Sequence, residues 1–117
     1  MRKLTYDEVV LINRRIGEDG TVQNSNLEFV MDMAKDIDGV VEHATTLLYE
    51  IPRAHSFTNG NKRTAFYAFA TFLKLNGYVL RREPRFNDKM ARVINDIATG
   101  KARRLKVERM IRHMVKR

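Results

Sequence analysis

Residues 54–66 of the chain, AHSFTNGNKRTAF, combine side chains that are suited to phosphate chemistry. His55 is the type of residue that takes up or releases a proton near neutral pH. Lys62 and Arg63 supply two cations, and both types form charge-assisted hydrogen bonds to phosphate oxygens. A base and two cations this close in sequence are the elements that phosphoryl transfer requires.

Gly60 and Asn61 precede the two cations, at the start of a helix predicted for about residues 61–75. The amino end of a helix carries a partial positive charge and several unpaired N–H groups, so Lys62 and Arg63 oppose its dipole unless an anion binds there. Gly60 has no Cβ and therefore lets the backbone approach a ligand closely. We expect the amides of Gly60, Asn61 and Lys62 to form a nest for an anion.

These residue types also have ordinary structural roles. A lone histidine is more often structural than catalytic, so His43, in a packed helix, and His113, in a basic segment, are interpreted as structural. Phe57 is interpreted as a core anchor that holds the loop down. Lys62 and Arg63 would each be solvated surface cations if they stood alone, but their grouping before a buried helix favours a phosphate site.

The periodicity of the apolar residues predicts an all-α fold, a compact bundle of about six helices in a single domain, 1–117. The segment NKRTAFYAFATFLKL, 61–75, is apolar almost all round and is predicted to be the central, buried helix. Capping-box spacing from Thr5 to Glu8 and from Ser25 to Glu28 predicts two helix starts. The other helices are predicted from Thr5 to about Ile16, from Ser25 to near Asp38-Gly39, from Val40 to Pro52, from Asn87 to Gly100, and over about 102–115.

The composition excludes several kinds of site. The chain has no cysteine, so disulfides, thiol catalysis and cysteine-bound metals are excluded. No apolar run approaches the length that spans a membrane, and the amino-terminal MRKLTYDEVV turns polar too early for a signal peptide. A cytoplasmic protein without a membrane segment is therefore expected.

The formal net charge of +8 is concentrated at the carboxyl end of the chain. Residues 101–117 contain eight Lys and Arg and one acid, Glu108, whereas residues 1–100 contain fourteen Lys and Arg and thirteen acids. The basic segment is interpreted first as a packed helix with a solvated face, and next as a surface for an acidic partner. A small basic helical nucleic-acid-binding protein is the competing hypothesis, although no base-reading helix and no aromatic stacking pattern is evident.

The loop HSFTNGNKR, 55–63, resembles the loop of the Fic/Doc family (filamentation-induced and death-on-curing proteins), which reads H-P-F-x-D/E-G-N-G/K-R between two helices of an all-helical domain. The following TAFYAFATFLKLNGYVL, 64–80, is similar to the death-on-curing branch. The resemblance is strongest over about residues 40–80 and is compatible with the whole chain. It implies a transferase that uses a nucleotide to modify a target protein.

The resemblance implies a role for each matching residue. His55 would be the general base that removes the proton of a hydroxyl on the target, and Phe57 would anchor the loop. Gly60 would supply backbone to the anion hole, and Asn61 and Arg63 would hold the nucleotide phosphates. The donor would be ATP and the metal Mg²⁺.

Two positions point, through the resemblance, to the branch in which a phosphate rather than AMP is transferred. Lys62 stands where adenylylating members have Gly, and Phe66 stands where they have a second Arg. A component of translation is the expected target. The self-inhibitory helix of other members has no convincing copy, since Thr46 to Glu50 is followed by Ile51, so a separate antitoxin protein is expected.

The chain departs from the family loop at Ser56 and Asn59. Ser56 replaces Pro and is expected to loosen the loop without changing its chemistry. Asn59 replaces the acid that binds Mg²⁺, so the metal should be held weakly by the protein and mainly through the nucleotide. A catalytically degenerate protein of the same fold therefore stands as an alternative to an active transferase.

Overall fold

The computed structural model describes residues 1–16, 21–80 and 88–116 of the chain, and six helices account for most of them. Their bounds are α1 Tyr6–Arg15, α2 Asn24–Lys35, α3 Val40–Arg53, α4 Asn61–Leu75, α5 Asp88–Ala98 and α6 Arg104–Met114. Two short strands, β1 Val79–Leu80 and β2 Val115–Lys116, pair in antiparallel orientation. The predicted all-α fold of about six helices is confirmed. None of the described helices is both long enough and apolar enough to cross a membrane.

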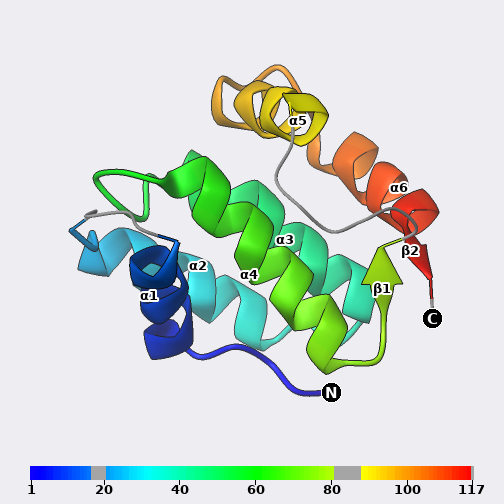
Figure 1. Cartoon of the computed structure of the whole chain (residues 1–117), viewed down its shortest axis with the longest axis horizontal. Helices are drawn as coiled ribbons and strands as arrows, with labels where there is room; N and C mark the ends of the chain where they lie inside the picture. The colour runs from blue at the N-terminus through cyan, green and yellow to red at the C-terminus, as the bar shows by residue number, and fades with distance from the viewer. Residues whose placement is uncertain (17–20, 81–87, 117) are drawn as a thin grey trace.

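Helix α4 runs through the middle of the bundle beside α3, with α1 and α2 on one side and α5 and α6 on the other (Figure 1). Its side chains Phe66, Phe69 and Phe72 are at most 1% exposed. Ala65 and Ala68 of the same helix are also fully buried, and their small size lets neighbouring helices approach closely. The predicted central helix is therefore confirmed, and burial of each aromatic side chain contributes about 1.5–3 kcal/mol.

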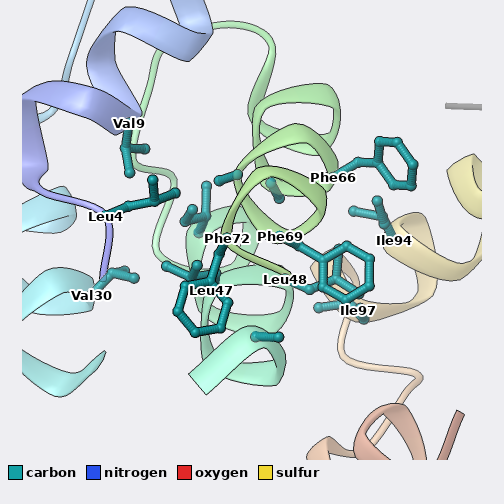
Figure 2. Close-up of a cluster of buried hydrophobic side chains, with 14 of the residues drawn as sticks. Leu4, Val9, Val30, Leu47, Leu48, Phe66, Phe69, Phe72, Ile94 and Ile97 are labelled. Carbon is teal, nitrogen blue, oxygen red and sulfur yellow. The ribbon is translucent and has the colours of Figure 1, made fainter. Parts of the chain in front are cut away.

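The core continues across α4 without a break. Leu4, Val9 and Val30 lie on one side of this helix, and Ile94 and Ile97 lie on the other (Figure 2). All six described helices contribute side chains to this one cluster. The amino end of α4 is therefore carried by a helix that is packed from several directions.

Most predicted helix ends agree with the structure. The Thr5 hydroxyl accepts a hydrogen bond from the Glu8 N–H at 3.2 Å, and the Glu8 carboxylate accepts one from the Thr5 N–H at 2.9 Å, so the capping box of α1 is confirmed. Helix α3 ends one residue after Pro52. After the C-cap of α4, Gly77 has φ +80°, as expected for a glycine that ends a helix.

The predicted start of α2 at Ser25 is wrong. The helix begins one residue earlier, its N-cap is Gln23, and no side chain caps it. The N–H of Gln23 donates instead to the carbonyl of Ser56 at 2.8 Å, so a long-range pairing fixes where this helix starts. The helix also ends at Lys35, earlier than predicted.

The end of the last helix differs from the prediction as well. Helix α6 stops at Met114, and Val115 lies in strand β2, where it pairs with Leu80 of β1. Strand pairing provides hydrogen-bond partners for backbone groups that would otherwise bond only to water at the end of the helix. The periodicity of apolar residues cannot predict this pairing, because the partner strand is distant in sequence. The predicted start of the fifth helix at Asn87 lies outside the described residues.

His43 is a buried structural residue. Its side chain is 1% exposed, its ring lies 4.4 Å from the ring of Phe72, and its Nδ1 lies 3.1 Å from the Ile37 carbonyl. Its Nε2 has no hydrogen-bond partner within the described residues. Burial lowers the pKa of His43 and the Lys3 ammonium acts in the same direction, against the hydrogen bond to Ile37 and the Asp38 carboxylate.

We expect His43 to make stability depend on pH. Because its pKa is lower in the folded protein than the ordinary value of about 6.5, the folded state binds fewer protons there than the unfolded chain does. The free energy of unfolding should therefore keep its full value above that pH and fall as the pH drops from about 6.5 through the folded pKa.

Urea unfolding of the full chain between about pH 5 and pH 8 measures this dependence. His43→Leu should remove it, whereas His113→Leu, at an exposed position of α6, should leave it unchanged. Equal pH slopes in wild type and His43→Leu would contradict the assignment.

Candidate active site

The loop between α3 and α4, residues 54–60, borders a pocket of about 460 Å³. The predicted base, anion-binding backbone and cations all line it, so the fold brings these sequence-predicted residues together. The volume is in the range of pockets that accept small-molecule ligands. The lining residues are Pro52, His55, Thr58, Asn59, Gly60, Asn61, Lys62, Arg63 and Ala98.

The amino end of α4 lies at this pocket. Gly60 is its N-cap and has φ +76°, a left-handed conformation that glycine adopts without steric cost. No side chain caps the helix, and within the described residues the N–H groups of Gly60, Asn61 and Lys62 make no hydrogen bond. Three free amides at the positive end of the helix dipole would stabilise a bound anion.

His55 has an uncommon backbone conformation, with φ +50°. The left-handed region costs an L-residue roughly 1–2 kcal/mol, and such residues gather at active sites. Its N–H donates to the Pro52 carbonyl at 3.3 Å, and its carbonyl accepts a hydrogen bond from Asn26 at 3.2 Å. The side chain is exposed and lines the pocket, so it presents a proton acceptor beside the amino end of α4.

Phe57 and Asn61 close the loop upon itself. Phe57 is 1% exposed and lies in the core, as its interpretation as an anchor requires. Its N–H donates to Asn61 Oδ1 at 2.9 Å, and its carbonyl accepts from Asn61 Nδ2 at 2.6 Å. The side-chain amide of Asn61 is thus committed to the loop, and its backbone N–H is the group that remains for a phosphate.

Ser56, at the position where the family loop has Pro, is bonded to the last turn of α3. Its side chain is fully buried. Both its hydroxyl and its N–H donate to the Ile51 carbonyl, at 3.1 Å and 3.4 Å. Proline could make neither bond, so hydrogen bonding here replaces the rigidity of the ring.

Asn13 of α1 is a residue that sequence reasoning missed. Its side chain is 1% exposed, and its Nδ2 donates to the Asn59 carbonyl at 3.2 Å and to the Thr64 hydroxyl at 2.9 Å. It therefore ties α1 to the loop and to the first turn of α4. A signal was present, because Asn13 follows the buried Val9 by four residues and lies on the same face of the helix, where a polar side chain needs partners.

The cations of the site come from the first turn of α4. Lys62 lines the pocket, and its ammonium donates to Asn95 Oδ1 of α5 at 2.8 Å, which joins the two helices. Arg63 lines the pocket at the next position. Among the described lining residues there is no carboxylate, so the side chains and the helix dipole together give the pocket a positive potential.

The predicted metal ligand, Asn59, is exposed at the pocket and offers one neutral amide oxygen. The neighbouring Thr58 hydroxyl already accepts a hydrogen bond from the Thr21 N–H at 2.8 Å. In the part of the chain that the structure describes, no group of three or more His, Cys, Asp or Glu could hold a metal ion. Because Mg²⁺ prefers charged oxygen ligands, these donors do not fit a magnesium ion held by the protein alone.

The basic carboxyl-terminal segment lies outside the pocket. Arg104 bonds Glu50, at 3.3 Å, and Thr46, and Arg112 bonds Glu42 at 2.5 Å, so both arginines hold α6 against α3. The remaining cations of the segment are exposed and form no ion pair within residues 1–16, 21–80 and 88–116. They are Lys101, Arg103, Lys106, Arg109 and Lys116.

Comparisons with known proteins agree with this geometry. The family model described as the Fic/DOC family matches residues 3–73. A curated protein named Toxin Doc, from Mycolicibacterium smegmatis, is 39% identical over 59 residues. That match covers 50% of this chain and 44% of the toxin, so the chain aligns with less than half of that relative.

We expect the pocket to bind phosphate, sulfate or ATP, and the bound ligand to raise the melting temperature by linkage. Arg63→Ala should reduce that increase, because a hydrogen bond to a charged group is worth about 1.5–3 kcal/mol, or roughly 10–100-fold in affinity. Arg14→Ala, which removes the same charge from an exposed position on α1, is the matched control. Thermal denaturation at increasing ATP measures both, and equal increases in wild type and Arg63→Ala would remove Arg63 from the site.

Proposed function

Because the chain belongs to the Fic/DOC family, we propose that it transfers a phosphate from ATP to a hydroxyl side chain of a target protein. AMP transfer is the less favoured form of the same reaction. The observation that carries the proposal is the composition of the pocket. His55 lies in one lining with three free backbone amides and two cations, and no carboxylate is found among the described lining residues.

The chemical step assigns a task to each group. The phosphates of ATP bind at the amino end of α4, to the N–H groups of Gly60, Asn61 and Lys62 and to the Arg63 guanidinium. His55 accepts the proton of the target hydroxyl. The target oxygen then forms a bond to the γ-phosphorus, the bond from that phosphorus to the bridging oxygen breaks, and ADP leaves.

Two residues support phosphate transfer over AMP transfer. Phe66, at the position where adenylylating members have a second Arg, is 1% exposed and belongs to the core, so it supplies no cation to the pocket. Lys62, at the position of a Gly, adds a side chain whose ammonium is held by Asn95. A site with a single set of cations beside the base can hold one group of phosphate oxygens, and this favours transfer of the γ-phosphate over transfer of AMP.

Magnesium belongs in this proposal as part of the substrate. The described pocket residues offer Mg²⁺ only neutral oxygens, such as that of Asn59. ATP therefore brings the metal on its own phosphates, and the protein adds the amides and cations that hold the rest of the phosphate charge.

Regulation is proposed to come from a separate antitoxin, and the similarity to Toxin Doc supports this. The nearest copy of a self-inhibitory motif, Thr46 to Glu50, lies within α3, and both of these residues bond to Arg104. They are thus engaged in packing α6, and this favours an inhibitor from another chain. The proposed setting is the cytoplasm, and the proposed target is a component of translation.

Binding of nucleic acid by α6 is a second candidate function. The five exposed cations of residues 101–116 that form no ion pair in the described residues favour it, because phosphate contacts need charge but no base-reading side chain. Salt-dependent RNA binding that survives His55→Ala and Arg63→Ala would support this function, and nucleotide binding lost in Arg63→Ala would support the transferase.

His55→Ala should abolish transfer and leave the fold intact. A general base contributes about 10²–10⁴-fold to the rate, and the side chain of His55 is exposed, so its removal leaves no cavity in the core. His113→Ala removes an exposed histidine on α6 and is the matched control. The assay incubates the full chain and a cell lysate with γ-labelled and α-labelled ATP in parallel, and unchanged turnover in His55→Ala would exclude this residue as the base.

Asn59→Asp should lower the Mg²⁺ concentration that transfer requires and raise turnover, because a carboxylate restores one charge to the surroundings of the metal. Wild type should transfer weakly and respond better to Mn²⁺, which tolerates neutral and nitrogen-bearing ligands. The measurement is transfer rate against Mg²⁺ concentration for both proteins on one target. An Asp variant that stays inactive at every concentration would favour the catalytically degenerate alternative.

A further inference from the structure

The peptide bond between Asn59 and Gly60 is held by the side chain of Asn13, which does not line the pocket. The Asn59 carbonyl accepts a hydrogen bond from Asn13 Nδ2 at 3.2 Å, so this oxygen points toward α1. The described chain contains no cis peptide bond. In a planar trans peptide the C=O and the following N–H point in opposite directions, and here that N–H belongs to Gly60. The Gly60 N–H is therefore directed away from Asn13, and Gly60 itself lines the pocket.

From this geometry we propose that Asn13 is a positioning residue for the anion site. By holding the Asn59 carbonyl, it directs the free N–H of Gly60 at the phosphate that binds beside α4. This inference rests on the phosphate site of the proposed function and assigns that site a residue on a different helix. Asn13 touches no substrate and acts only through the peptide that it orients.

The peptide needs such an anchor because its neighbour is glycine. Gly60 is in the left-handed region, but glycine reaches several other regions at little cost, so the peptide before it can rotate. Within the described residues, no other donor reaches the Asn59 carbonyl. Without Asn13, this oxygen would be free to turn toward the pocket, where it would repel a phosphate.

The hydrogen bonds of Asn13 indicate that its side chain orients the peptide between Asn59 and Gly60 in addition to contributing to stability. Its Nδ2 serves two acceptors, Asn59 and Thr64, whereas its Oδ1 is buried without a partner in the described residues. A carbonyl can only accept, so the amide cannot be turned over to satisfy Oδ1 without losing the bond to Asn59. A buried acceptor without a partner is unfavourable, so Asn13 Oδ1 lowers the stability of the fold. The orientation that leaves it unpaired is also the one in which Nδ2 can donate to the Asn59 carbonyl.

Three variants of the full chain separate positioning from stability. Thr64→Val removes one buried partner and leaves the bond from Asn13 to Asn59, so it is the matched control. The double variant Asn13→Leu, Thr64→Val removes both buried polar groups together, which keeps the site apolar and well packed. Asn13→Asp, nearly the same shape but without a donor, provides a second test should the double variant unfold.

The experiment titrates inorganic phosphate into each ¹⁵N-labelled protein and follows the Gly60 amide by two-dimensional NMR. We expect a saturable shift of this amide in wild type and in Thr64→Val. In the double variant and in Asn13→Asp, phosphate affinity should fall at least about tenfold and the Gly60 response should disappear, with the remaining spectrum little changed.

Wild-type phosphate affinity in both Asn13 variants, or wild-type protein whose Gly60 amide does not respond to phosphate, would overturn the inference. The readout needs no transfer, so its failure differs from failure of the proposed function. Phosphate binding that depends on Asn13 without any transfer would leave the inference standing and count against the transferase. If the Asn13 variants bind phosphate normally and transfer at the wild-type rate, the inference about Asn13 would be overturned and the proposed transferase function would stand.

Discussion

The structure of the site depends on donors for the loop carbonyls. A loop that packs into the core must pair its backbone oxygens, because a buried carbonyl without a donor costs as much as a lost hydrogen bond. The donors come from α1, α2, α4 and the segment just before α2, so several elements must be in place for the loop to close. The carbonyls of residues 55, 56, 57 and 59 accept from Asn26, the Gln23 N–H, Asn61 and Asn13, respectively.

Holding the Asn59 carbonyl toward α1 leaves the following N–H, that of Gly60, on the other side of the peptide, and this connects the packing of the bundle to the chemistry of the pocket. The local arrangement is unfavourable in two ways: His55 has positive φ, and Lys62 and Arg63 lie at the positive end of a helix dipole. Together these features cost a few kcal/mol, from about 1–2 for the backbone and up to about 1 for each cation. Burial of the α4 aromatic side chains offsets that amount.

Much of the fold could be predicted from the sequence because its signals are local. Periodicity located α3 and α4, and the Thr5 capping box marked the start of α1. The start of α2 and the strand at Val115 could not be predicted, because pairing with distant segments decides both. For the site, the motif placed the lining residues in one stretch, but the left-handed His55 and the contacts of Asn13 depend on how α1 and α2 pack against the loop.

The proposed binding and catalysis rest on different parts of this pocket, and so either could be lost without the other. The proposed anion nest consists of backbone N–H groups, and the side chains of Asn13, Asn26 and Asn61 bond the loop carbonyls beside it. In the proposed reaction, proton transfer would depend on the exposed side chain of His55, and Asn59 would offer the metal only a neutral oxygen. A chain that lost its catalytic groups would still keep the nest, since the same hydrogen bonds hold the loop into the core. Under this proposal, anion binding would follow from the hydrogen bonds that build the loop, whereas transfer would depend on a few exposed side chains, so each can be measured without the other.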